Sequence, residues 1–208
     1  MAKAKKLTRA EQKLLRPIQI LDAAFEEFVA HGYSAARVED IADRIGVTKG
    51  TVYVYFPTKE DLFSAMIGHI SAPLQDLLAE SRELTGSSAE KLRAFLLLAY
   101  DKITRDRRAR ELMRFIISEG ARFPQLIDQH HTELVEPLIG HTQQILDEGI
   151  DKGEFRKSPT VNAEIIVAPM LKLLMDLMIF DNRRTVDLTA HVAAHLDLVL
   201  NGIVAKHG

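Results

Sequence analysis

Cysteine is absent from the 208-residue sequence. Without cysteine there is no disulfide framework and no thiolate zinc site, and this fits the reducing cytoplasm, where we expect the protein to be located. The basic residues 1–10 lead into no apolar stretch, so we predict no secretory signal. The longest apolar stretch, residues 161–180, also contains four polar side chains, at Asn162, Glu164, Lys172 and Asp176. A membrane helix rarely contains so many, so we expect a core or interface helix there and no membrane partner.

Strand-like alternation, sequence repeats and low-complexity tracts are also missing, whereas apolar residues recur at helical spacing along almost the whole chain. In the first such segment the apolar stripe consists of Ile18, Leu21, Phe25, Phe28 and Val29. Pro17 suits the first turn of this helix and Gly32 suits its end. In a later segment Pro137 predicts a kink. The pattern predicts an all-α protein of about nine helices.

No single sign of charge dominates the chain. The formal net charge is −2, which argues against a general nucleic-acid binder. However, residues 1–16 hold six basic side chains and one acidic side chain, whereas residues 61–208 hold 17 basic and 21 acidic ones. We expect a phosphate backbone to meet the positive end, although such a charge run is also typical of a solvated N-terminal arm.

The strongest signal in the chain is residues 38–56, which predict two short amphipathic helices joined by a tight turn at Gly46. Such a helix-turn-helix places its second helix in the major groove of DNA. Helical stepping from Thr48 turns Val52 and Phe56 towards the core. The opposite face is small at its centre and rich in hydroxyl groups at its edges, and it consists of Gly50, Thr51, Tyr53, Val54 and Tyr55. This face can approach base edges while its rim binds phosphates.

Three further residues lie at predicted helix N-termini. Thr48 and Lys49 begin the second helix of the unit, where backbone N–H groups favour a phosphate. Lys59 lies at the start of the next helix in the same arrangement. The alternative for the tyrosines is simple packing, but packed aromatic side chains would lie on the side of Val52 and Phe56. We therefore predict that the opposite face binds DNA.

Residues 32–63, GYSAARVEDIADRIGVTKGTVYVYFPTKEDLF, resemble the N-terminal domain of the tetracycline-repressor (TetR) family, and the length and helix plan of the whole chain are similar to that family. The resemblance implies a homodimer in which each subunit binds one half-site of double-stranded operator DNA. It also implies that Lys49 occupies a variable, base-reading position. The DNA-contact positions that it implies are Thr48, Thr51, Tyr53, Tyr55 and Lys59.

Several residues depart from the family pattern. Just before the second helix the family often has threonine or serine, whereas this chain has Ala36 and Arg37, and Arg37 can replace a hydroxyl–phosphate contact by a charged one. Val54 stands where an aromatic residue is common, and Tyr55 stands where histidine is common. These departures leave the operator sequence open.

The rest of the chain contains no catalytic motif, because a glycine-rich phosphate loop, a nucleophile elbow and a paired-carboxylate signature are all missing. We expect no enzyme, no catalytic residue and no cofactor. His191 and His195 have the i, i+4 spacing that can chelate a metal, but without a third ligand we expect polar or interface histidines and no metal site. We predict an N-terminal arm and DNA-binding domain at residues 1–57, followed by a helical effector-binding and dimerisation domain at residues 58–208.

Aromatic and methionine side chains are spread over several helices of the second domain. They favour a pocket for a small, mainly apolar effector, although plain core packing is the alternative for each of them. The candidates are Phe63, Met66, Phe95, Tyr100, Met113, Phe115 and Met170. The resemblance implies a ligand cavity among the fourth to eighth helices.

The last two predicted helices carry apolar stripes that one subunit would struggle to cover alone. We expect a dimer interface there, formed by Leu171, Leu174, Met178, Val192, Leu196, Val199 and Ile203. The leading hypothesis is thus a dimeric repressor that a small molecule releases from its operator. The alternatives are an architectural or effector-independent DNA-binding protein, which a filled C-terminal core would favour, and an enzyme with an incidental helix-turn-helix.

Overall fold

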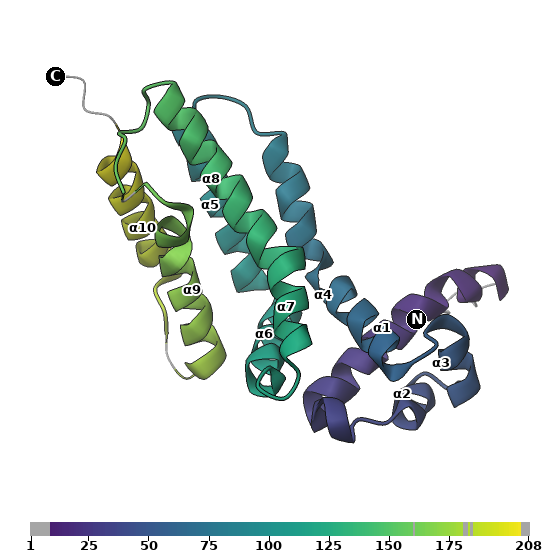
Figure 1. The fold of residues 1–208 in the computed structure, drawn as a ribbon. Helices are drawn as coiled ribbons and strands as arrows, with labels where there is room; N and C mark the ends of the chain where they lie inside the picture. The colour runs from purple at the N-terminus through teal and green to yellow at the C-terminus, as the bar shows by residue number, and fades with distance from the viewer. Residues whose placement is uncertain (1–8, 160, 181–182, 184, 205–208) are drawn as a thin grey trace, which may run out of the picture. The chain divides into compact units, whose positions relative to one another are not determined.

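The structure is a computed structural model that describes residues 9–159, 161–180, 183 and 185–204. Its α-helices are α1 Arg9–Ala35, α2 Val38–Arg44, α3 Lys49–Tyr55, α4 Lys59–Arg82, α5 Ser88–Arg105, α6 Arg107–Glu119, α7 Pro124–His130, α8 Glu136–Asp151, α9 Ala163–Phe180 and α10 Leu188–Ile203 (Figure 1). A π-helical turn, η1 His131–Val135, joins α7 to α8. Because α7, η1 and α8 are continuous, the described residues form nine helical segments, and the predicted all-α fold is confirmed.

The chain forms two compact units, residues 1–70 and residues 71–208. The division lies within α4, whereas the sequence pattern places it at residues 57/58. The first turns of α4 belong to the N-terminal unit because their apolar side chains are buried there. Near the end of that unit, His69 Nε2 lies 3.2 Å from the Asp22 carboxylate of α1.

Two residues predicted to line the ligand pocket are core residues of the N-terminal unit. Phe63 is 2% exposed and Met66 is 1% exposed. The ring of Phe63 packs edge-on against the rings of Phe28 and Tyr33, each 4.9 Å away. We therefore correct the assignment of Phe63 and Met66, because the side chains from the first turns of α4 complete the core of this unit.

Helix α1 is longer than predicted. It already includes Arg9, so Pro17 lies inside the helix and not in its first turn. Ile18 is 45% exposed and does not share the buried stripe of Leu21, Phe25 and Phe28. The apolar pattern locates the buried part of the helix but not the exposed turns that precede it. Gly32, with φ +75°, breaks the helical backbone at the predicted end, in a conformation that favours glycine.

The C-terminal unit is a helical bundle in which α5 packs against α8, α9 and α10. Its core includes Leu92, Phe95, Leu96, Leu146, Leu173 and Leu196. No helix in the part of the chain that the structure describes, α9 included, is long and apolar enough to span a membrane.

A buried hydrogen-bond chain joins α5, α9 and α10. The Tyr100 hydroxyl lies 2.8 Å from His195 Nδ1, and His195 Nε2 lies 2.8 Å from the Ile166 carbonyl oxygen. Because a carbonyl can only accept, Nε2 carries the hydrogen and Nδ1 accepts from the tyrosine. His191 Nε2 donates to the Pro169 carbonyl in the same way, at 3.2 Å. Burial lowers the pKa of His195 and raises the pKa of Tyr100 to about 12, so both groups are neutral near pH 7.

The kink predicted at Pro137 takes the form of a π-helical turn. Pro137 has no N–H to donate to the carbonyl of Glu133 four residues earlier. The helix widens over His131–Val135, directly before the proline, and then continues as α8. A π-helical turn is one of the local adjustments by which a helix accommodates such a disruption.

Candidate nucleic-acid interface

The predicted helix-turn-helix is present in the N-terminal unit as α2, a turn and α3. Gly46 takes φ +67° in the turn, a conformation that L-residues rarely adopt. The Thr48 hydroxyl caps α3 by accepting a hydrogen bond from the Thr51 N–H at 3.2 Å. Val52 is fully buried, as predicted. Local signals therefore position the second helix of the unit.

The predicted DNA-reading face of α3 faces solvent. Val54 is 80% exposed, and Gly50 is exposed as well. A Cβ atom added at Gly50 would meet only the Thr48 hydroxyl, at 3.8 Å, so the packing of the protein does not require glycine there. A missing side chain at an open helical position allows close approach of another molecule. Tyr53 and Tyr55 lie at the sides of this face and are half-buried.

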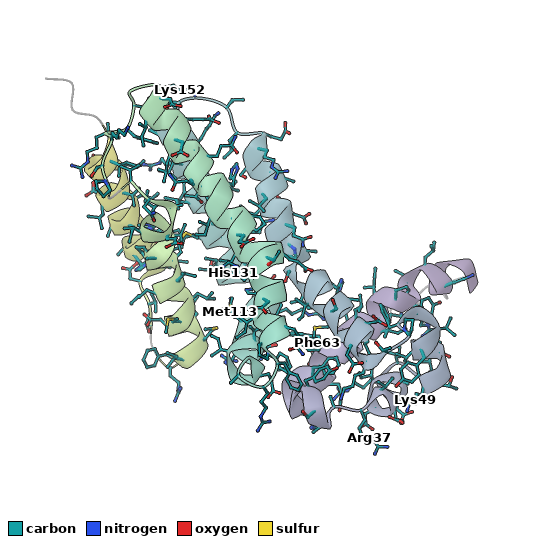
Figure 2. The ribbon with its side chains drawn as sticks, viewed as in Figure 1. Arg37, Lys49, Phe63, Met113, His131 and Lys152 are labelled. Atoms are coloured by element: carbon teal, nitrogen blue, oxygen red, sulfur yellow. The ribbon has the colours of Figure 1, made fainter. Side chains whose placement is uncertain are left out.

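Three charged side chains cluster between α2 and α3. Lys49 Nζ donates to a Glu39 carboxylate oxygen at 2.7 Å, and Arg37 Nε lies 4.0 Å from the other oxygen. The Lys49 ammonium also lies over the Tyr53 ring, 5.5 Å from its centroid. The hydrogen bond from Lys49 lowers the pKa of Glu39, and the same bond raises the pKa of Lys49. Figure 2 shows Arg37 and Lys49 projecting from the N-terminal unit beside α2 and α3.

Glu39 is a functional candidate that the sequence pattern did not identify. It is the acidic residue in the first turn of α2, where a carboxylate favours helix formation. Its neighbour across the turn is the residue that we expect to read a base. We therefore expect Glu39 to compete with DNA for the Lys49 ammonium.

Lys59 connects the start of α4 to the end of α1. Its ammonium donates to the carbonyl oxygens of Ala36 at 2.6 Å and Ser34 at 3.4 Å, and it lies 4.8 Å from the centroid of the Tyr33 ring. Burial lowers the pKa of Lys59. The Tyr33 hydroxyl donates to Glu60 at 2.9 Å, and burial is the largest cause that raises the pKa of Tyr33. An ammonium has three donors, so Lys59 can hold this position and still meet a phosphate.

Helix α4 is capped at the same place. The Asp61 N–H donates to the Thr58 hydroxyl at 3.0 Å, and the Thr58 N–H donates back to the Asp61 carboxylate at 3.2 Å. This is a capping box in which aspartate serves in place of glutamate. It fixes the helix N-terminus beside Lys59.

A buried carboxylate orients α1 and α2 within the unit. Glu27 of α1 is 3% exposed, and Arg44 of α2 donates to it from two nitrogens at 3.0 and 3.1 Å. His31 approaches the same carboxylate at 3.5 Å. Removing Arg44 would leave the buried Glu27 carboxylate uncompensated, which makes this pair a determinant of how α2 presents the turn.

The five remaining pocket candidates lie in the C-terminal unit. Phe95, Tyr100 and Met170 belong to one buried cluster. Phe115 is buried on α6 and Met113 is half-buried there, both outside that cluster. Helix α6 is tied to α9 by Arg114, which donates to the Met178 carbonyl at 2.6 Å.

The predicted dimer stripe on α10 is not free to meet a partner. Leu196, Val199 and Ile203 are between 4% and 7% exposed and belong to the core of their own subunit. Met178 of α9 is 9% exposed, and Leu174 and Val192 are half-buried. Of the predicted set, Leu171 alone is more than half exposed, at 55%. We therefore correct the assignment of Leu196, Val199 and Ile203 to the dimer interface, because the α10 stripe packs on α5 of the same chain.

Helix α9 carries four apolar side chains that face solvent. They are Ile165, Leu171, Met175 and Ile179, each 54% to 63% exposed, and Leu198 of α10 is 70% exposed. Helical stepping puts the four α9 residues on one side of the helix. We call these four residues the exposed α9 face.

The two histidines of α10 have structural hydrogen bonds in the bundle. Both donate to backbone carbonyls of α9, and His195 also accepts from Tyr100. Among the residues that the structure describes, no three histidine, cysteine, aspartate or glutamate side chains come together as a metal-binding set.

Residues 20–66 match the bacterial regulatory proteins of the tetR family, and residues 83–196 match the tetracyclin repressor-like C-terminal domain. The fatty acid metabolism regulator protein of Bacillus subtilis is 25% identical over 198 residues, which cover 94% of this chain and 100% of the relative. FadR from Bacillus subtilis in complex with stearoyl-CoA has a TM-score of 0.66 at 23% identity, covering 89% of this chain and 98% of that one.

The fold also matches SmeT, the repressor of a multidrug efflux pump of Stenotrophomonas maltophilia. In its complex with triclosan, SmeT has a TM-score of 0.73 at 23% identity, and the match covers 91% of this chain and 92% of that one. At such identities these two structures establish a common fold.

Proposed function

The chain belongs to the tetR family of bacterial regulatory proteins, and we propose that it is a dimeric repressor that binds operator DNA and leaves it when a small, mainly apolar molecule binds. The observation that carries the DNA-binding part is the geometry of α3. One side of this helix holds the fully buried Val52, and the opposite side presents Gly50 and Val54 to solvent. A helix anchored in this way fits a major groove.

The roles of the contact residues follow from where they lie on this helix. Lys49 donates to guanine in the groove, and Val54 touches a thymine methyl group. The hydroxyl groups at the rim and the nearby cations bind phosphates, which supplies affinity without reading sequence. These phosphate-binding residues are Arg37, Thr48, Thr51, Tyr53, Tyr55 and Lys59.

The effector in this proposal binds in the C-terminal unit, residues 71–208. Two relatives of the same fold hold molecules with large apolar parts, stearoyl-CoA in one case and triclosan in the other. The apolar cluster that contains Phe95, Tyr100 and Met170 offers the same kind of environment. The described residues of the unit that we expect to meet the effector are Phe95, Tyr100, Met113, Phe115 and Met170.

Helix α4 supplies the coupling, because it begins in the DNA-reading unit and ends in the effector-binding unit. A ligand that shifts α4 changes the spacing of the two DNA-reading units of a dimer. Those units must fit grooves about 34–36 Å apart. A coupling free energy of about 1–3 kcal/mol between ligand and operator is sufficient for regulation. The exposed α9 face is where we place the second subunit.

Selection of bound fragments from random DNA tests the proposal. We expect a two-fold symmetric site, and we expect Lys49→Ala to relax the preference at one base pair of each half-site at a cost of about 1–3 kcal/mol. Lys152→Ala is the matched control, because Lys152 forms only an exposed ion pair with Glu148 in the C-terminal unit. Recovery of the same preferences from wild type and Lys49→Ala would remove Lys49 from base reading.

A further inference from the structure

His130, the last residue of α7, is buried without a hydrogen-bond partner. It is 7% exposed, and both of its ring nitrogens lack a partner. Among the described residues the other buried side-chain atom without a partner is the Ser71 hydroxyl. A native structure rarely leaves a buried polar group unsatisfied, because its desolvation is then uncompensated.

The other buried or half-buried histidines of the C-terminal unit have partners. Both nitrogens of His195 are used, and His191 donates to a carbonyl. His141 lies 2.8 Å from the Ser81 hydroxyl. The bundle therefore satisfies imidazole rings where they serve packing, and His130 is the exception.

The position of His130 places it on the inner side of its helix. Leu134, one turn further on, is 4% exposed, so the two side chains share a buried face. The π-helical turn begins directly after His130, at His131. Such turns occur frequently at functional sites, because they widen the helix locally.

The imidazole of His130 is neutral at physiological pH. Burial is the largest cause that lowers its pKa, and the neighbouring His131 adds to this, whereas Glu133 opposes it. A neutral imidazole has one nitrogen that donates and one that accepts. An apolar residue would fill the same space without any desolvation cost, so this polar ring needs a partner that the described part of the chain does not provide.

We propose that His130 is the polar anchor of the effector site, where its ring nitrogen accepts a hydrogen bond from the acidic O–H group of an otherwise apolar small molecule. Phenols and long-chain carboxylic acids share this chemistry. The acid O–H either remains a donor to the nitrogen or passes its proton to it, and the resulting carboxylate or phenolate then compensates the imidazolium. This inference rests on the proposed ligand response and specifies the chemistry of the same site.

Pairs of probes that differ only in the O–H group test this proposal on the full-length protein. Palmitic acid is compared with methyl palmitate, and triclosan is compared with its methyl ether. We expect the free O–H compound of at least one pair to bind wild type about tenfold more tightly than its methylated partner, as measured by calorimetry and by thermal shift. The two pairs distinguish a carboxylic acid from a phenol.

His130→Leu is the decisive variant. Without ligand we expect a higher Tm than that of wild type, because an unpaired buried polar ring is replaced by an apolar side chain. With ligand we expect equal binding of the free and methylated compounds. His130→Gln, which keeps a hydrogen-bonding group, should retain part of the preference and covers the case in which the leucine variant does not fold. His141→Leu is the control, and we expect it to keep the O–H preference.

Two outcomes would overturn the assignment of His130. In one, wild type binds free and methylated compounds equally, so that a ligand response exists without a polar anchor. In the other, His130→Leu keeps the full O–H preference. A protein whose operator binding responds to none of the four probes, nor to a wider set of apolar compounds, would instead refute the ligand response itself and the anchor with it.

Discussion

Lys59 has two roles that one substitution can separate. In the free protein its ammonium donates to the carbonyls of Ala36 and Ser34 and lies over the Tyr33 ring. On DNA we expect the same ammonium to meet a phosphate. Lys59→Met removes the charge and all three donors but retains a long apolar stem, so the packing of the stem is preserved.

The expected loss of stability follows from these contacts. A hydrogen bond that involves a charged group contributes about 1.5–3 kcal/mol, and a cation–π contact at an exposed site contributes about 0.5–1 kcal/mol. Lys59 is only half-buried, so solvent keeps the total near the lower end of these ranges. We expect Lys59→Met to lower the free energy of unfolding of the N-terminal unit by about 2 kcal/mol.

Urea unfolding of the N-terminal unit, monitored by fluorescence of its tyrosines, measures this loss. Lys152→Met is the control, and for an exposed ion pair we expect a change within about 0.5 kcal/mol. Operator binding is then measured as a function of salt concentration. Loss of one phosphate contact should reduce the slope of log K against log salt by about 0.9.

The two measurements can refute the two roles separately. A Lys59→Met protein as stable as the control would show that the contacts with the two carbonyls do not hold α4 against α1. An unchanged salt slope would remove Lys59 from the DNA interface, even if stability falls as expected.

Three other perturbations test the site and the fold. Glu39→Gln should release Lys49 and raise affinity for non-operator DNA, measured by fluorescence anisotropy; an affinity equal to that of wild type would show that the carboxylate does not compete with DNA. Met175→Glu, on the exposed α9 face, should yield folded monomers in sedimentation, whereas Leu196→Glu should unfold the subunit because it places a charge in its core; a dimeric Met175→Glu protein would move the interface elsewhere. Burial lowers the pKa of His195 below its ordinary value near 6.5, so the unfolded chain takes up the proton first. The stability that neutral His195 contributes is present above pH 6.5 and is lost as the pH falls from 6.5 through the lowered pKa of the folded protein. The urea midpoint of wild type should therefore fall between pH 7 and pH 5, and that of His195→Asn should fall less. Equal pH dependence in wild type and His195→Asn would contradict the role of His195.

The helix-turn-helix could be predicted because every signal for it is local. Gly46 supplies the positive φ of the turn, Thr48 caps the second helix, and Val52 marks the buried side one turn later. Each of these signals depends on residues at most four positions apart. The capping box at the start of α5 is local in the same sense, because Ser87 and Glu90 are three positions apart.

Pairings between helices could not be predicted in this way. The bond between Lys59 and the Ala36 carbonyl depends on how α4 packs against the end of α1, and the bond between Lys49 and Glu39 depends on how α3 packs against α2. A sequence shows that these residues are charged, but it does not show which acceptor lies within reach. Glu39 was missed for this reason.

Helical periodicity by itself determined that the chain is all-α and where its apolar stripes lie. It left open which surface covers each stripe, because an amphipathic pattern is the same whether the cover comes from the same subunit or from a second one. Only the tertiary structure decided that Leu196 packs inside its own bundle while Met175 faces solvent, and that Phe63 completes the N-terminal unit. It also decided that His130 is buried without a partner, because hydrogen-bond satisfaction depends on every helix packed around a side chain and not on the residue alone.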